Sequence, residues 1–107
     1  METLISSDPK LTEIIEKIVA AVHPTKIYLF GSRVRGDIHP DSDYDFLIIY
    51  DGNLSKREVK LAIRQMFGLA DIGMDLFVLS TPEYEWQKNV ATTLGMEVNL
   101  TGQVVHE

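Results

Sequence analysis

Two aspartates, Asp43 and Asp45, stand two residues apart at the start of an apolar segment. On a β-strand this spacing puts both side chains on one face, roughly 6.6 Å apart along the strand. Carboxylates that close repel each other and lose hydration beside apolar neighbours, so the pair is costly unless a cation compensates. The spacing therefore favours a Mg²⁺ site, since Mg²⁺ prefers hard oxygen ligands. The structural alternative is a turn that merely caps the strand.

A third aspartate, Asp75, is the one charged residue in the apolar segment 73–81. Charged side chains are rarely fully buried without a partner. Two interpretations stay open. Asp75 either meets Asp43 and Asp45 from a neighbouring strand, or it lies at the exposed start of its own strand.

A Gly31-Ser32 pair directly follows the apolar segment 26–30, where the backbone must turn. If a short helical turn begins there, its free N–H groups form a nest that binds phosphate. The Ser32 hydroxyl and the Arg33 guanidinium would be further donors to such an anion. The fingerprints of P-loop and Rossmann proteins do not occur in the chain, so this turn and its nearness to the aspartates carry the phosphate prediction.

Hydrophobic periodicity predicts the elements that would position these groups. We expect helices over 9–22 and 55–70 and from Thr81 onward, and strands over 26–30, 43–50, 74–80 and in the closing segment 103–107. Asp8-Pro9 is typical of a helix start, and Ser55 with Glu58 forms a capping box. Together these elements predict a small α/β (α+β) domain, with a three- to four-stranded mixed sheet packed against helices.

The C-terminal quarter is less regular. We expect the helix from Thr81 to carry Trp86 and Val90, with Gly95 and the run 91–93 breaking it and a short helix resuming before Thr101-Gly102. The closing segment is then an edge strand. A hairpin of 96–100 with 103–107 is the alternative.

The length, composition and charge of the chain argue against several classes of protein. The chain has 107 residues, which predicts a single domain over 1–107. There are no cysteines and no apolar run of ~18 residues, and the N-terminus does not have the layout of a signal peptide, so we expect a cytoplasmic protein without a membrane partner. A net charge of −6 makes direct nucleic-acid binding an unlikely main task, but it does not argue against nucleotides bound with Mg²⁺.

The segment 31–48 resembles the G-S-x₁₀-D-x-D signature of the DNA polymerase beta-like nucleotidyltransferase superfamily. Gly31-Ser32, ten residues and then Asp43 and Asp45 match it in full, and Asp75 fits the third acidic residue. The chain looks closest to the minimal nucleotidyltransferases, several of which act as antitoxins to HEPN-domain partners.

The resemblance implies a nucleotidyltransferase fold and a two-metal mechanism. Two Mg²⁺ ions would be held by Asp43 and Asp45, with Asp75 completing the site of the metal that activates the acceptor. Gly31, Ser32 and Arg33 would hold the triphosphate. A nucleoside triphosphate, ATP by the resemblance, would give its nucleotide to a hydroxyl, such as a tyrosine of a cognate HEPN-type toxin.

The sequence leaves four matters open. The protein could instead be a non-catalytic antitoxin that neutralises its partner by binding, or a nucleotidyltransferase for small molecules of the aminoglycoside kind. A homo-oligomer is compatible with either. Arg57, Lys60 and Arg64 form a basic stripe that is either a solvated face or a docking surface. Met66, Tyr84 and Trp86 are expected in a core or interface, with stacking on a nucleobase as the alternative.

Overall fold

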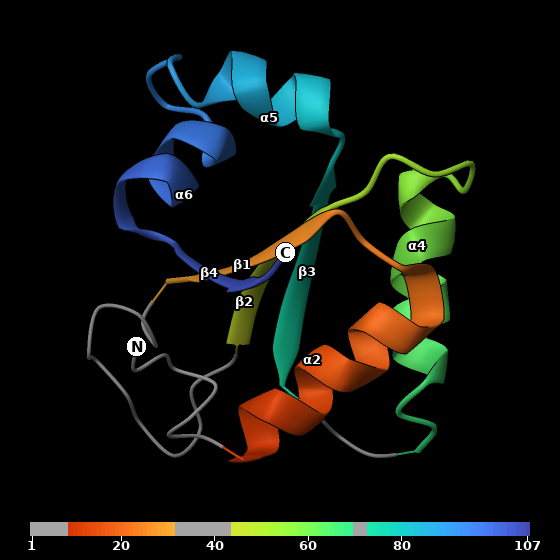
Figure 1. The fold of residues 1–107 in the computed structure, drawn as a ribbon. Coiled ribbons are helices and arrows are strands. Elements are labelled where there is room, and N and C mark those ends of the chain that lie inside the picture. Colours follow the sequence, from red (N-terminus) through yellow and green to blue (C-terminus); the bar gives the residue numbers. More distant parts are fainter. Residues whose placement is uncertain (1–8, 32–43, 70–72) are drawn as a thin grey trace.

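The computed structural model describes residues 9–31, 44–69 and 73–107. Over these ranges the chain forms four helices and a four-stranded sheet (Figure 1). In chain order the elements are α2 (Pro9–Val22), β1 (Lys26–Phe30), β2 (Tyr44–Ile49), α4 (Lys56–Gln65), β3 (Met74–Leu79), α5 (Thr81–Gln87), α6 (Leu94–Thr101) and β4 (Gln103–His106). The predicted α+β class with a mixed sheet is confirmed. No helix in the described ranges is long and apolar enough to cross a membrane.

The strands are ordered β3-β2-β1-β4. β2 and β3 are parallel and are joined through α4, whereas β1 runs antiparallel to both β2 and β4. The central strand β2 has buried apolar side chains on both faces, as its sequence predicts. The closing segment is an edge strand, as expected. The alternative hairpin is wrong, because residues 96–100 belong to helix α6.

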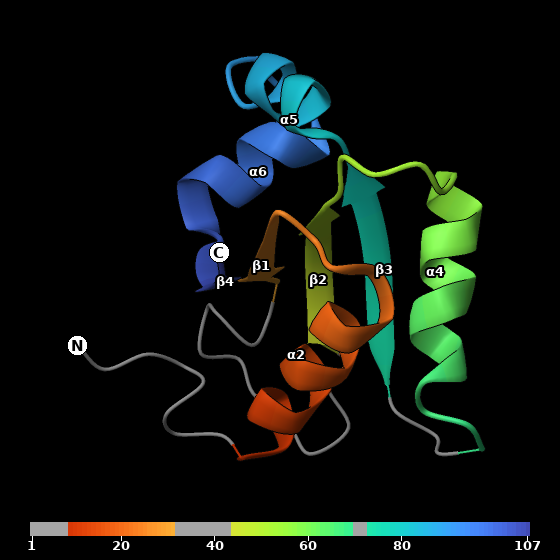
Figure 2. The ribbon, with the colours of Figure 1, turned by 45° about the vertical axis from the view of Figure 1, so that its right-hand side comes forward.

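Helices cover the two faces of the sheet differently (Figure 2). α2 and α4 pack on one face, where Ile18, Phe46 and Ile63 are fully buried. α5 and α6 pack on the other face over a smaller core that includes Tyr28, Leu47 and Val98. In Figure 2 both of these helices gather towards the end at which the arrows of β2 and β3 point. The starts of these two strands therefore lie away from α5 and α6.

Helix α4 begins as its capping box predicts but ends at Gln65, so the expected extension to residue 70 is wrong. The N–H groups of Met66 and Phe67 donate to carbonyls three residues earlier, which tightens the chain out of the α-helix. Gly68 then adopts a φ of 58°, the left-handed conformation that commonly ends helices. Met66 is 40 % exposed as a result and does not join the core.

Gly95 does not break a helix, contrary to expectation. Helix α5 ends at Gln87, so Val90 lies outside it, and Gly95 is the second residue of α6. A Cβ at Gly95 would collide with the side chain of Gln87, whose Oε1 accepts a hydrogen bond from the Gly95 N–H at 2.9 Å. The glycine is explained by the close approach of α6 to α5, which sequence periodicity does not reveal.

Candidate active site

Asp45 and Asp75 are paired in register on the neighbouring parallel strands β2 and β3. The pairing is held from its first position, where the Tyr44 N–H donates to the Gly73 carbonyl at 3.0 Å. Neighbouring strands lie ~4.8 Å apart, and paired residues point to the same face. The structure thus brings together two of the three predicted aspartates.

The face that these carboxylates share is the one that α5 and α6 only partly cover. Tyr44 and Phe46 belong to the core beneath α2 and α4, so the alternation of β2 sends Asp45 to the opposite face. Asp45 is half-buried there, and Asp75 is exposed as the second residue of β3. Asp75 thus lies at the exposed start of its strand and also beside Asp45, whereas its predicted approach to Asp43 involves a residue outside the described ranges.

Gly31 brings the end of β1 into the same site. Its φ is 80°, a conformation that side chains disfavour, and a Cβ on it would collide with Oδ2 of Asp45. The pairing of Phe30 with Asp45 fixes this approach, because it places the last residue of β1 directly beside the carboxylate. Gly31, Asp45 and Asp75 consequently follow one another across three adjacent strands.

The remaining predicted site residues lie outside the described parts of the chain. Asp43, Ser32 and Arg33 belong to this group. Their roles as metal ligand and as phosphate donors stay predictions.

The donors that the structure brings together suit a magnesium ion. Asp45 and Asp75 offer hard carboxylate oxygens at the end of the sheet where β2 and β3 begin, and Gly31, which lacks a side chain, lets the Asp45 carboxylate approach the backbone after β1. Mg²⁺ is usually bound through one or two carboxylates and completes its octahedron with waters and substrate phosphates. Among the described residues no group of three His, Cys, Asp or Glu side chains gathers as a full metal cage. The observed pair of carboxylates is therefore suited to a metal ion whose other ligands are phosphate oxygens and waters.

Arg64 supports the start of β3. Its Nη2 donates a hydrogen bond of 2.6 Å to the carbonyl of Met74, the residue before Asp75. We expected this arginine in a basic stripe with Arg57 and Lys60, both of which are exposed. Arg64 is instead tied to the strand that carries a site residue, a role that helical spacing alone did not reveal.

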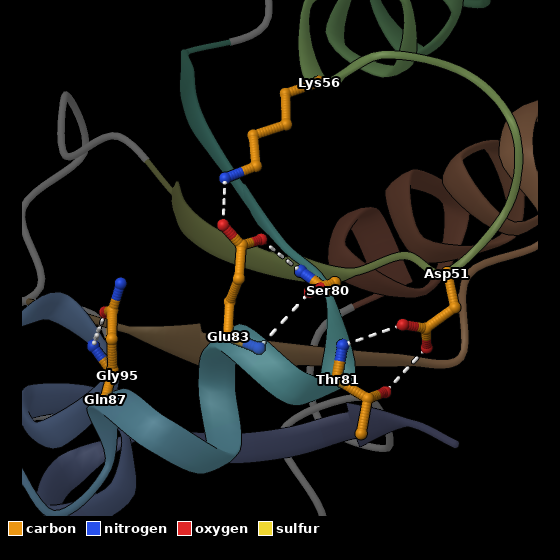
Figure 3. Close-up of polar contacts among 7 residues, drawn as sticks. All are labelled: Asp51, Lys56, Ser80, Thr81, Glu83, Gln87 and Gly95. Atoms are coloured by element: carbon orange, nitrogen blue, oxygen red, sulfur yellow. Dashed lines mark hydrogen bonds and ion pairs between the residues drawn. The ribbon is translucent and has the colours of Figure 1, made fainter.

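The opposite end of β2 carries an aspartate of a different kind (Figure 3). The Asp51 carboxylate accepts hydrogen bonds from the N–H and hydroxyl of Thr81, at 2.8 and 2.6 Å, and from the Thr25 hydroxyl at 2.8 Å. The Thr81 hydroxyl is the largest cause that holds the pKa of Asp51 below its ordinary value. These bonds fasten the start of α5 to the chain just before β1 and just after β2, so Asp51 is a structural residue.

The capping box at the start of α5 adds a second polar cluster at this end (Figure 3). Glu83 accepts a hydrogen bond from the Ser80 N–H at 2.8 Å and from Lys56 Nζ at 2.8 Å. The bond from Lys56 is the first cause, and that from Ser80 the second, of a lowered pKa for Glu83. Hollows in this half of the molecule, one of about 380 Å³ beside Asp51 and one of about 450 Å³ along α6, are not lined by the paired carboxylates.

Among the aromatic residues, the sequence analysis missed Phe77. It follows Asp75 by two residues on the same face and is 38 % exposed. The period of two could have identified it, since any residue two positions from Asp75 on this strand must share its face. Tyr84 is core, as expected, and burial raises its pKa. Trp86 is 66 % exposed, so it is not part of the core, and its expected alternative place in an interface stays a prediction.

The sequence matches one family model, described as a nucleotidyltransferase domain, over residues 10–100. This match spans the paired carboxylates, Gly31 and every described element except the last strand. No curated protein matches the chain significantly in sequence.

Two solved structures share the fold. The first is a toxin-antitoxin crystal structure with AMP-PNP, at 22% identity and a TM-score of 0.62, which covers 87% of this chain and 69% of that one. The second is a candidate nucleotidyltransferase from Sulfolobus solfataricus, at 25% identity and a TM-score of 0.54, which covers 71% of this chain and 68% of that one.

Proposed function

This chain belongs to the nucleotidyltransferase domain family, and we propose that it transfers AMP from ATP to a hydroxyl group. The observation that carries the proposal is the in-register pair of Asp45 and Asp75 beside Gly31. Two facing acids at the starts of neighbouring strands are poorly explained as structural residues, because like charges on neighbouring strands destabilise a sheet. We place residues 1–107 in one catalytic domain that acts in the cytoplasm.

Each residue of the site has a chemical role in this proposal. The acceptor oxygen attacks the α-phosphorus of ATP, the bond from the α-phosphorus to the β-phosphate oxygen breaks, and pyrophosphate leaves. Asp75 takes the proton of the acceptor hydroxyl. The backbone of Gly31, with Ser32 and Arg33, holds the β- and γ-phosphates. Because Gly31 lacks a side chain, the Asp45 carboxylate can lie close to the backbone that would hold the phosphates.

Asp43, Asp45 and Asp75 are the residues that would hold two Mg²⁺ ions. When bound, such ions neutralise charge on the attacking and leaving oxygens of an in-line displacement. The protein contributes the positions of its carboxylates. The hydrogen-bonded start of the β2–β3 ladder fixes Asp45 against Asp75, and Arg64 anchors the strand residue before Asp75.

We propose that the acceptor is a tyrosine of a HEPN-type toxin partner, so that the transfer acts as an antitoxin reaction. The resemblance of the site motif to minimal nucleotidyltransferases supports this assignment. A solved toxin-antitoxin structure with AMP-PNP shares the fold, which is compatible with the proposal. The described residues form mainly the sheet and its covering helices, which is compatible with a hydroxyl that a partner presents.

The experiment is a transfer assay with α-labelled ATP, Mg²⁺ and the protein encoded by the neighbouring gene. We expect label on a tyrosine of that protein, and at least a ~100-fold lower rate with Asp45→Asn. Asp51→Asn makes the same chemical change at the other end of β2 and should keep the activity. Label that persists with Asp45→Asn would contradict the proposal.

The same assay separates catalysis from simple binding. If Asp45→Asn fails to label the partner but still neutralises it as well as the wild type, neutralisation is by occlusion. If instead a hydroxylated small molecule is labelled and the partner is not, the acceptor assignment is wrong while the transfer chemistry stands.

A further inference from the structure

The exposed ring of Phe77 lies next to the paired carboxylates and has no role in the transfer chemistry assigned above. It is 38 % exposed, although the other apolar side chains of β3 are buried. Asp75 precedes it on the same face, ~6.6 Å away along the strand. Aromatic side chains beside a few polar groups are typical of small-ligand sites. The position of the ring therefore indicates that it contacts a bound ligand.

The Phe77 ring is held in place by its neighbours. Its centroid lies 5.7 Å from that of the Phe30 ring, with 54° between the planes. Phe30 itself is only 5 % exposed, and the buried Leu47 is paired with Phe77 across the strands. A ring fixed in this way is pre-organised, so a ligand that packs on it does not have to order it first.

The strand order tells on which side of the site the ring lies. Gly31 directly follows β1, Asp45 and Asp75 are the second residues of β2 and β3, and these three strands are adjacent in that order. With the triphosphate at Gly31, the acceptor must approach from the side of β3. The backbone of Phe77 is on β3, on the acceptor side of this order, and its ring extends over β2 toward Phe30.

We infer that Phe77 binds an aromatic ring of the acceptor and selects a phenolic hydroxyl, as in tyrosine, over the aliphatic hydroxyl of serine or threonine. This inference rests on the proposed function. Aromatic rings pair at centroid separations of ~4.5–7 Å, so a phenol with its oxygen at Asp75 has its ring within reach of Phe77. A serine side chain presents the same oxygen but no group that reaches the ring.

Binding is tested by NMR on the full chain with labelled phenylalanine rings. The chain has four phenylalanines, and the signal lost in Phe77→Leu identifies the one in question. With Mg²⁺ and AMP-PNP present, millimolar N-acetyl-L-tyrosinamide should shift the Phe77 signal and N-acetyl-L-serinamide should not. No shift with the tyrosine compound, or an equal shift with Mg²⁺ and AMP-PNP alone, overturns the inference. In the latter case the ring would contact the nucleobase.

Kinetics give a second test, with the tyrosine-bearing partner as acceptor. Phe77→Leu should raise the KM for the partner about two- to tenfold, while Phe77→Trp should restore it. The KM for ATP should not change. Trp86→Leu removes another exposed aromatic ring from α5 and should leave both constants unchanged. A changed KM for ATP alone overturns the inference. Absence of transfer in the wild type counts against the proposed function, and the NMR experiment still decides the role of Phe77.

Discussion

The two ends of the β2–β3 pair both carry aspartate, but in opposite settings. At the far end, three hydrogen bonds satisfy Asp51, which joins α5 to two strands. At the near end, Asp45 and Asp75 face each other across a strand pair, on a surface that α5 and α6 leave partly open. The comparison shows that residue type alone does not mark a functional acid. What distinguishes the near end is that one acid is placed against another.

The largest difference between the two ends is expected for Asp75→Asn. Transfer should fall at least ~100-fold, because the hydroxyl proton loses its acceptor and the metal a ligand. Without divalent metal, the free energy of unfolding should be unchanged or rise by roughly 0.2–1 kcal/mol, because a charge repulsion disappears. Thermal unfolding with and without Mg²⁺ measures this. Mg²⁺ should stabilise the wild type more than the variant. A variant that is clearly less stable in metal-free buffer would make Asp75 a structural residue.

Gly31→Ala should have the next largest effect. The variant combines a disfavoured backbone conformation with a collision at Asp45, so we expect a loss of ~1–3 kcal/mol in the free energy of unfolding and at least ~10-fold slower transfer.

Gly68→Ala is the matched control for that variant. Gly68 also has a positive φ, of 58°, but a Cβ there meets no atom within 4 Å. It should cost only ~1 kcal/mol and leave transfer intact. If both variants lose the same stability and transfer at the same rate, the approach of Gly31 to Asp45 does not contribute to the activity.

The smallest effect is expected for Asp51→Ala. It should cost ~1 kcal/mol in the free energy of unfolding, from lost bonds at an exposed helix start, with transfer unchanged. The pKa of Asp51 is lowered from 3.8 in the folded protein, so its stabilising effect is present above that value and disappears as the pH falls through the lowered pKa. Urea unfolding from neutral to acid pH should therefore show that the difference between variant and wild type is constant above about pH 3.8 and shrinks as the pH falls further. A constant difference would mean that the Asp51 charge is irrelevant.

The fold could be predicted largely from local signals. The capping box at Ser55 and the Pro9 helix start were located correctly, and so were the four strands. The errors fell where a distant contact decides the outcome. Gly95 was taken for a helix breaker because its close contact with Gln87 is invisible in the sequence. Similarly, α4 ends before Gly68, which has a positive φ. The prediction extended the helix past this glycine because the apolar pattern continues beyond it.

In the candidate site, too, some features follow from local sequence and others from distant contacts. Sequence alone determined the acids, the glycine turn and the face on which each strand residue lies, because motif spacing and the period of two are local properties. Only the tertiary structure decided that Asp45 pairs with Asp75, that Gly31 touches the Asp45 carboxylate and that Arg64 holds the start of β3. Register between strands distant in sequence is set by the packing of both faces together, and no single segment contains that information.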